Sequence, residues 1–382
     1  MKIAAFNVEN LFDRARAFNE DNEDLTQAVL RATSELNGLF EKAIYTAADL
    51  ARMRELIVEL GLDKSDTGPF VLLRQIRGRM VSRPGSGQFV LKAKGREDWV
   101  GWVELRMAPV NEIAIMNTGR VIRDVNADVL AVIEAENRVA LKQFSDFVIR
   151  EVGGLPYDQV MVIDGNDDRG IDVGLMTKAG YTIGAMRSHI HDLKPDGAPI
   201  YSRDCPEYMV HTPAGETVWV VPNHFKSKFG GDDPGSRAKR EAQAVRTAEI
   251  YRSLRAEGQD NVVVLGDLND TPDSEPLQGL LADTDLVDVS DHPTFDTGEF
   301  KGRPGSGDRG IGTFGLGNDN QKIDYLLLSP ALFARVRKSG LFRMGAWPGS
   351  RPPRWTVYPE LKRDIHVASD HHVIWAEIAD GS

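Results

Sequence analysis

The stretch from residue 261 to 272 constrains the fold of this chain more than any other. Residues 262–265 are Val-Val-Val-Leu, an apolar run with three β-branched members, which predicts a buried strand. Gly266 and the run Asp-Leu-Asn-Asp-Thr-Pro then predict a break into a loop. Asp267 and Asn269 therefore lie just past a strand's C-terminal end, the edge where ligands bind in open α/β sheets. Their oxygens can reach one hard cation or one water, although Asp and Asn are also common in turns.

Five other predicted strands also carry polar side chains at an end. Apolar runs predict these strands over residues 2–8, 127–134, 218–222, 323–328 and 372–378. The polar residues at their ends are Asn7, Glu9, Glu134, Asn223, His224, Asp324, Asp370 and His371. A cap or a surface position explains any one of these residues, but six such strand ends in one chain favour a shared site with metal or acid–base chemistry.

The remaining elements are predicted from apolar spacing and turn residues. Helices are expected twice within residues 20–61 and again over 138–148 and 237–256. Further strands are expected over 70–76, 88–94, 99–106, 159–163 and 170–176. Residues 271–320 are expected to be rich in loops, and the prolines of 344–360 predict an irregular segment.

The segment from Phe70 to Arg96 stands apart in its charge. It holds seven basic residues and no acidic one, whereas the whole chain has a net charge of −11. Two interpretations are equally open: a surface that contacts phosphates, or the solvated face of a sheet.

Cysteine usage and the start of the chain bear on the compartment. Cys205 is the only cysteine, so no intrachain disulfide can form, and it stands before a proline in a loop, where it is expected to be incidental. The first residues include one Lys and reach polar positions within six, unlike a signal peptide, and no apolar run approaches the roughly 20 residues of a membrane span. We expect a cytoplasmic protein, with secretion also compatible.

Five motifs together resemble a known superfamily. They are Asn7–Asp13 (Asn-Val-Glu-Asn-Leu-Phe-Asp), Asp128–Glu134, Gly266–Asn269, Ile323–Tyr325 and Ser369–His371. In this order they resemble the endonuclease/exonuclease/phosphatase superfamily, which includes deoxyribonuclease I and the abasic-site endonucleases. The first motif and the run 223–228 are most similar to bacterial members, and the resemblance covers residues 1–13 and about 120–380.

The resemblance implies a fold and a metal site. The fold is α/β, a four-layer α/β sandwich of two mainly antiparallel sheets with helices outside. Residues 1–382 would be one such domain, interrupted by an insertion over 20–120 of two helices and basic strands. The implied cofactor is Mg²⁺ or Mn²⁺, and the implied metal ligands are Glu134, Asn7, Glu9 and Asp370.

The resemblance also implies roles at the phosphoester. Asp267 and Asn269 would position the attacking water and the phosphate, and Asp324 would orient His371. His224 would contact the phosphate or protonate the leaving oxygen. The substrate phosphate would be bound by Asn223, Arg169, Lys226 and Lys228. Whether Asp267 or His371 takes the proton of the water is left open.

Two departures from the family pattern bear on the substrate. Ile133 stands where many relatives have Gln, and the 20–120 insertion is much longer than the usual connection. Asp172 is either a subgroup feature or a buried carboxylate paired with Arg169.

The expected function is a divalent-metal-dependent nuclease, with DNA favoured over RNA and endo- or exonuclease action open. The alternative is a phosphatase or phosphodiesterase acting on small-molecule or lipid head-group phosphoesters, which the acidic net charge favours slightly, and a non-enzymatic binding module is a third. The expected partner is a nucleic acid substrate. We expect a monomer with no membrane contact and no obligate protein partner.

Overall fold

The computed structural model describes residues 1–9, 23–84, 88–105, 111–167, 170–228, 233–302, 305, 307–350 and 352–381. The chain divides into two compact units, residues 1–12 with 111–382, and residues 13–110. The insertion expected over 20–120 overlaps the second unit, and its place within a single enzyme domain stays a prediction.

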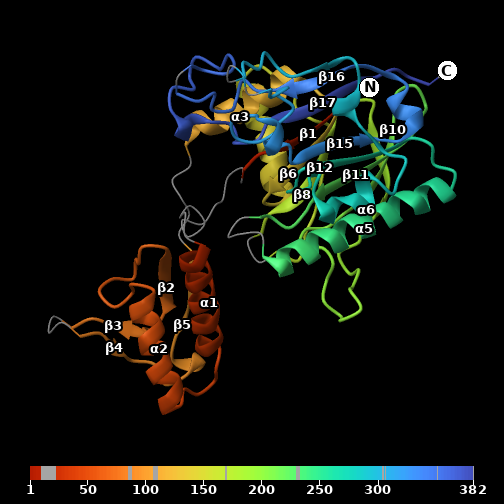
Figure 1. Cartoon of the computed structure of the whole chain (residues 1–382). Helices are drawn as coiled ribbons and strands as arrows, with labels where there is room; N and C mark the ends of the chain where they lie inside the picture. Colours follow the sequence, from red (N-terminus) through yellow and green to blue (C-terminus); the bar gives the residue numbers. More distant parts are fainter. Residues whose placement is uncertain are drawn as a thin grey trace. The chain divides into compact units, whose positions relative to one another are not determined.

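Two sheets form the larger unit (Figure 1). The first has seven strands in the order β14 (Phe295–Asp296), β16 (Val336–Phe342), β17 (Val373–Ile378), β1 (Lys2–Asn7), β6 (Val129–Ala135), β8 (Asp172–Thr177) and β7 (Gln159–Ile163). The second has six strands in the order β13 (Val287–Asp288), β15 (Asp324–Leu328), β12 (Val262–Asp267), β11 (Thr217–His224), β10 (Glu207–His211) and β9 (Thr182–Arg187). Most neighbouring strands are antiparallel, which agrees with the two mainly antiparallel sheets that the family resemblance implied.

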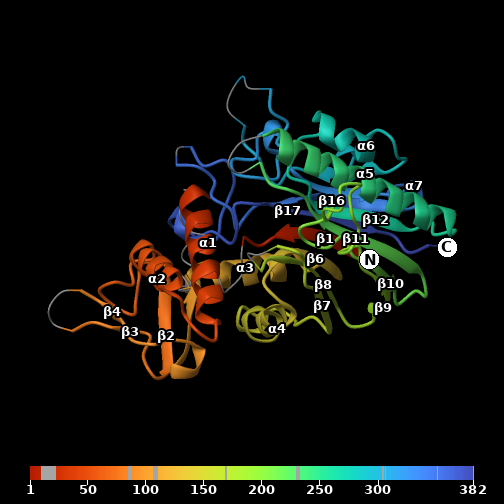
Figure 2. The same cartoon turned by 90° about the horizontal axis from the view of Figure 1, so that it is seen from below.

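Helices cover the outer faces of both sheets. On the first sheet lie α3 (Glu112–Val125) and α4 (Arg138–Gln143), which continues as a π-helical turn over Phe144–Ile149. On the second lie α5 (Pro234–Ala256) and α6 (Gln278–Leu281), and Figure 2 shows these two helices along β11 and β12. The short helix α7 (Pro330–Phe333) follows β15, and single 3₁₀ turns lie at 275–277, 289–291, 319–321 and 364–366.

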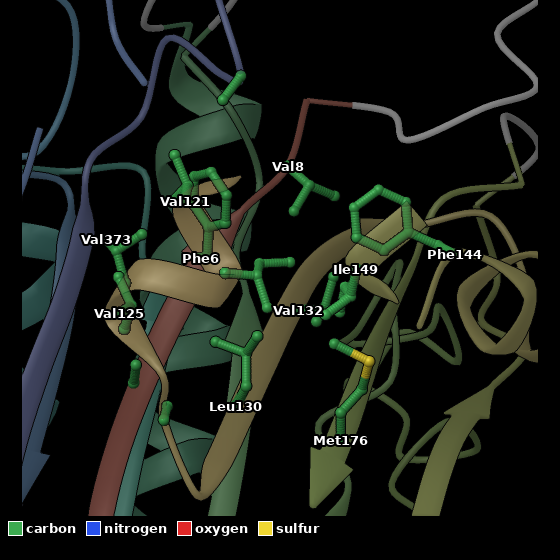
Figure 3. Close-up of a cluster of buried hydrophobic side chains, with 14 of the residues drawn as sticks. Phe6, Val8, Val121, Val125, Leu130, Val132, Phe144, Ile149, Met176 and Val373 are labelled. Carbon is green, nitrogen blue, oxygen red and sulfur yellow. The ribbon is translucent and has the colours of Figure 1, made fainter. Parts of the chain in front are cut away.

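Three apolar cores separate these four layers. Figure 3 shows the outer core of the first sheet, where Phe6, Leu130 and Val132 meet Val121 and Val125 of α3. A second core lies between the sheets, and a third lies between the second sheet and α5. Each fully buried side chain of this kind contributes about 1.5–3 kcal/mol, so the sheets form a rigid support for side chains at their ends.

Strand direction brings the polar strand ends to one edge. β1 is parallel to β6, and β11 is parallel to β12, so the C-terminal ends of each pair lie side by side. β15 is antiparallel to β12 and β17 is antiparallel to β1, so these two strands begin at the same edge. The edge therefore collects the last residues of four strands and the first residues of two.

The smaller unit has its own elements and core. It contains α1 (Glu23–Phe40), α2 (Ala47–Glu59), a ladder of β2 (Val71–Arg77) with β5 (Val100–Leu105), a ladder of β3 (Val81–Ser82) with β4 (Val90–Leu91), and a 3₁₀ turn at 96–98. Trp99 is fully buried, packs edge-on against Phe40 and donates a hydrogen bond to Tyr45 (2.9 Å). An apolar core of this kind is what a separately folding unit needs.

Several expected elements differ from the structure. The strand expected over 88–94 is limited to β4, and the segment 271–320 contains α6, β13 and β14. The elements α3, β9, β10 and β16 were not predicted. Helix α3 begins at Glu112, is capped by the Asn111 side chain and packs its apolar residues on the first sheet. No helix in the described ranges is long and apolar enough to cross a membrane.

Candidate active site

Asp324 and His371 form a buried hydrogen-bonded pair at the shared edge of the sheets. His371 Nδ1 lies 2.8 Å from Asp324 Oδ2, and both side chains are buried. The hydroxyl of Ser369 accepts a hydrogen bond from the His371 backbone N–H (3.0 Å), which fixes the backbone before β17. A carboxylate on one ring nitrogen sets the tautomer, so His371 Nε2 is the nitrogen left to face the site.

Asp267 lies at the centre of the cluster. Its Oδ2 is 3.2 Å from Asn7 Nδ2, 3.7 Å from His224 Nε2 and 3.9 Å from His371 Nε2. Its Oδ1 accepts a hydrogen bond from the backbone N–H of Asn269 (2.8 Å). Asp267 thus connects the end of β12 with the ends of β1 and β11 and with the residue pair just before β17.

Glu134 and Asp370 extend the cluster along the first sheet. Glu134 Oε1 is 3.5 Å from Asn7 Nδ2 and 3.7 Å from His224 Nε2. Asp370 Oδ1 is 3.7 Å from His371 Nε2, and the Asp370 backbone N–H donates to Glu9 Oε2 (3.2 Å). Five carboxylates, two imidazoles and one amide therefore converge at the edge.

The backbone is strained where these side chains are presented. Glu9, Glu134 and Asn269 have φ values of 50°, 68° and 55°, in the left-handed region that residues with a side chain adopt rarely. Such strain concentrates at functional sites. Only glycine fits at position 266, where φ is 123°, because a Cβ atom there would lie 2.1 Å from the Asn223 carbonyl oxygen.

The protonation of the cluster reflects crowded carboxylates. Burial, followed by the Asp324 carboxylate, raises the pKa of Asp267 well above its usual value. Burial alone would lower the pKa of His371, but the carboxylates of Asp324, Asp370 and Asp267 outweigh it and hold that pKa well above its usual value. A cation bound among these carboxylates would favour their ionised forms.

The side chains present fit a divalent cation. Carboxylate oxygens are the preferred ligands of Mg²⁺ and Mn²⁺, and Glu134, Glu9 and Asp370 offer them. Donor atoms of Asp267, Asp324 and His371 also lie within 4.8 Å of one another, as a metal would require. Because Asp324 and His371 already share a 2.8 Å hydrogen bond, the side of the cluster that holds Glu134 is better suited to an ion.

Asn7 is brought to the cluster with its amide nitrogen toward the carboxylates. Its Nδ2 faces Glu134 and Asp267, while its Oδ1 accepts from the Glu9 backbone N–H (3.1 Å). In this orientation Asn7 links two carboxylates, and its role as a metal ligand stays a prediction.

The expected phosphate-binding residues are not all near the cluster. Asn223 is fully buried on the opposite side of β11, where its Oδ1 accepts from Thr247 of α5 (3.2 Å), because neighbouring residues of a strand face opposite sides. This placement supports a role in seating β11 on α5, not contact with a phosphate. Lys228 pairs with the buried carboxylate of Asp270, and Lys226 is partly buried beside them. Arg169 lies outside the described residues.

Several residues that hold the site were not predicted. Thr313 Oγ1 accepts hydrogen bonds from the backbone N–H groups of Ile323 (3.0 Å) and Asp324 (2.8 Å), which fixes the start of β15. The Phe314 ring packs edge-on against His371, with 5.0 Å between ring centroids. Both stand in the segment that was expected to be loop, and no sequence signal marks them.

A thiol nucleophile is not available at the site. Cys205 is fully buried against α5, and burial raises the pKa of its thiol to about 12. Asp172 is buried too, and it accepts a hydrogen bond from the Gly165 backbone N–H (2.7 Å).

The fold and the site define the class of this protein. It is a four-layer α/β sandwich with a carboxylate and histidine site at one edge of its two sheets. A family model described as "Endonuclease/Exonuclease/phosphatase family" matches residues 94–342, well over half of the chain, and the protein belongs to this family. The family expected from the motifs is confirmed. Members of this family are phosphoester hydrolases and generally depend on divalent metals.

Solved structures with a similar fold share little sequence with this chain. A mannosyl-6-phosphatase from Bacteroides thetaiotaomicron has 14% identity and a TM-score of 0.49, covering 70% of this chain and 90% of its own. An endonuclease/exonuclease/phosphatase from Bacteroides vulgatus has 17% identity and a TM-score of 0.47, covering 69% and 91%. The human nocturnin catalytic domain with bound sulfate has 14% and 0.46, covering 71% and 88%. No curated protein matches the chain.

Proposed function

We propose that the protein is a divalent-metal-dependent phosphodiesterase that hydrolyses nucleic acid, with DNA favoured, by attack of water on phosphorus. One observation carries the proposal. Asp267 Oδ2 lies within 4 Å of Asn7 Nδ2, His224 Nε2 and His371 Nε2, beside Glu134. Phosphodiester cleavage needs an activated water, charge neutralisation and a stabilised leaving oxygen, and these side chains supply all three.

Glu134, Glu9 and Asp370 would hold Mg²⁺ or Mn²⁺. When bound, the ion supplies positive charge against the phosphate oxygens. Asn7, donating to Glu134 and Asp267, keeps those two carboxylates from separating.

Two groups can take the proton of the attacking water. Asp267 faces the site with Oδ2, and His371 faces it with Nε2 while Asp324 holds Nδ1. The Asp324 carboxylate stabilises the charged form of the His371 ring. This favours His371 as the group that stabilises the phosphate or carries the proton. His224 Nε2, between Glu134 and Asp267, is placed to donate a proton to the leaving oxygen.

The test is incubation of the purified protein with supercoiled plasmid in Mg²⁺ and, separately, in Mn²⁺. We expect nicking that chelator abolishes and that is lost in Asp267→Ala. Glu249→Gln is the control, because Glu249 is an exposed residue of α5 outside the site. Intact plasmid and intact single-stranded oligonucleotide, together with hydrolysis of a small chromogenic phosphomonoester, would refute the nuclease and favour the small-molecule phosphatase.

A further inference from the structure

The smaller unit carries a basic segment that the proposed catalytic site does not use. Three of the seven basic residues between Phe70 and Arg96 are neutralised by acidic neighbours. The pairs are Arg74 with Glu104 (2.6 Å), Arg83 with Asp66 (2.6 Å) and Arg96 with Glu41 (3.3 Å). These three guanidinium groups are therefore explained by contacts inside the unit.

The other four cations have no such explanation. They are Arg77, Arg79, Lys92 and Lys94, all exposed. Within the part of the chain that the structure describes, none of the four forms an ion pair. In a protein of net charge −11, the positive charges of these four side chains favour contact with a polyanion, with Asp98 as the acidic neighbour of Lys94.

The fold gathers these four cations around one end of the β2–β5 ladder. Arg77 ends β2 opposite Val100 of β5, and the next residue, Gly78, lies against the backbone of Asp98 and Trp99. The Lys92 backbone N–H donates to Met80, next to Arg79 (2.8 Å). The Lys94 backbone N–H donates to the Asp98 carboxylate (2.7 Å). These backbone contacts bring the segments 77–79 and 92–94 to the same end of the ladder, so the four exposed side chains leave neighbouring parts of the chain.

An exposed indole accompanies the cations. Trp102 of β5 stands opposite Arg74 of β2 and is 41% exposed, and Ile76 beside it is 65% exposed. The inward residues of the same strands, Leu73 and Val103, are buried. A large aromatic side chain held on the outer face of a ladder offers a flat surface on which an unpaired base can stack.

We propose that Arg77, Arg79, Lys92, Lys94 and Trp102, the basic surface, bind single-stranded nucleic acid. The four cations contact backbone phosphates, and Trp102 stacks on a base. Only a strand with unpaired bases satisfies both parts of the surface, because a duplex hides the faces of its bases. Single-stranded nucleic acid would then be the substrate class of the proposed nuclease. Only this step from ligand to substrate rests on the proposed function.

The test is binding of a fluorescein-labelled 20-nucleotide oligothymidylate to the full chain in chelator, followed by anisotropy at several salt concentrations. Replacing all four cations by Gln should weaken binding at least about 10-fold and reduce the slope of log K against log salt by about 3, near 0.7 for each lost phosphate contact. Trp102→Ala should weaken binding about 5- to 150-fold, and Trp102→Phe should restore most of it. A labelled hairpin duplex should bind more weakly than the single strand.

The control carries the same charge change elsewhere. Arg31, Lys64, Arg337 and Lys338 are also exposed, and replacing these four by Gln should change affinity less than about 3-fold. Equal weakening by both fourfold variants, or preferred binding of the duplex, would overturn the inference. Binding to phosphatidylserine vesicles is measured as well. If the fourfold basic-surface variant binds oligothymidylate like the wild type but no longer binds these vesicles, the inference is also overturned.

Hydrolysis of bis(p-nitrophenyl) phosphate, measured separately, keeps the two proposals apart. The fourfold basic-surface variant should retain this activity, because none of its residues belongs to the catalytic cluster. Binding without any phosphodiester hydrolysis would refute the nuclease and leave the basic surface supported. Hydrolysis without oligothymidylate binding would refute the basic surface alone.

Discussion

The buried ion pair between Arg240 and Asp270 gives a prediction whose size follows from the structure. Arg240 of α5 and Asp270 are both essentially inaccessible to solvent, and Arg240 Nε lies 2.9 Å from Asp270 Oδ2. Lys228 pairs with the other oxygen of Asp270, and Tyr325 donates to the Asp270 backbone carbonyl (2.8 Å). Asp270 directly follows Asn269, so the pair ties the loop after β12 to α5.

Removal of Arg240 leaves a buried carboxylate with one partner fewer. Breaking a buried ion pair by removal of one member costs about 3–5 kcal/mol, and the remaining Lys228 places Arg240→Met near the lower value, about 3 kcal/mol. Asp270→Asn should cost a similar amount, because it leaves the Arg240 charge buried. Arg240→Met with Asp270→Leu should cost less than the sum of the single changes, because no fully buried charge remains and Lys228 is partly exposed.

The assay is urea unfolding with the free energy extrapolated to water. Arg237→Met is the matched control, because Arg237 lies about one turn away on α5 and its pair with Glu275 (3.1 Å) is exposed. Exposed pairs contribute little, so this variant should unfold close to the wild type. Equal unfolding free energies for Arg240→Met and Arg237→Met would refute the reasoning.

Three further predictions follow from the site and its supports. Asp324→Asn should lower kcat for plasmid nicking about 10²- to 10⁴-fold with the fold intact by circular dichroism, because His371 loses its orienting carboxylate; a loss under 10-fold would contradict that role. Gly266→Ala should lower the free energy of unfolding by at least about 1–3 kcal/mol, because its Cβ would lie 2.1 Å from the Asn223 carbonyl oxygen, and unchanged denaturant midpoints would contradict this. Burial raises the pKa of Asp172 to about 6 in the folded protein, from a usual value of 3.8. The proton is therefore bound more tightly in the folded state, so the stability that protonation contributes is complete below pH 3.8 and is lost as the pH rises to about 6, by up to about 3 kcal/mol. Asp172→Asn should remove that part of the pH dependence in urea unfolding between pH 4 and 6, and identical pH profiles for the two proteins would contradict it.

The sequence predicted the edge of the sheets well, because strand ends are local features. The Val-Val-Val-Leu run predicted β12, and the residues after it, Asp267 and Asn269, are where the sheet edge presents side chains. The parallel pairing of β1 with β6 and of β11 with β12 then made the separate strand ends meet. The roles given to these residues stay predictions.

The sequence did not predict which side chains of a strand end face the site. Asn223 and His224 were both placed there, but adjacent residues of β11 face opposite sides, so only His224 approaches Asp267. Strand periodicity was the signal that should have separated them. Arg240 and Phe314 carry no comparable signal, because their contacts with Asp270 and His371 arise only from tertiary packing.

The smaller unit shows a similar division between local and tertiary information. The Thr46 cap of α2 and the antiparallel strands around Arg74 follow from local residues. The sequence left the meaning of the basic segment open, because pairing with Glu41, Asp66 and Glu104 depends on how distant segments pack.

The central claim is that a cation held at Glu134 drives phosphodiester hydrolysis. The most direct measurement is the initial rate of cleavage of a labelled oligonucleotide as a function of free Mn²⁺, for the wild type and for Glu134→Gln. We expect a rate that saturates with Mn²⁺ in the wild type, and in the variant either no cleavage or a midpoint at least about 10-fold higher. Cleavage by the variant with an unchanged rate and midpoint would contradict the account.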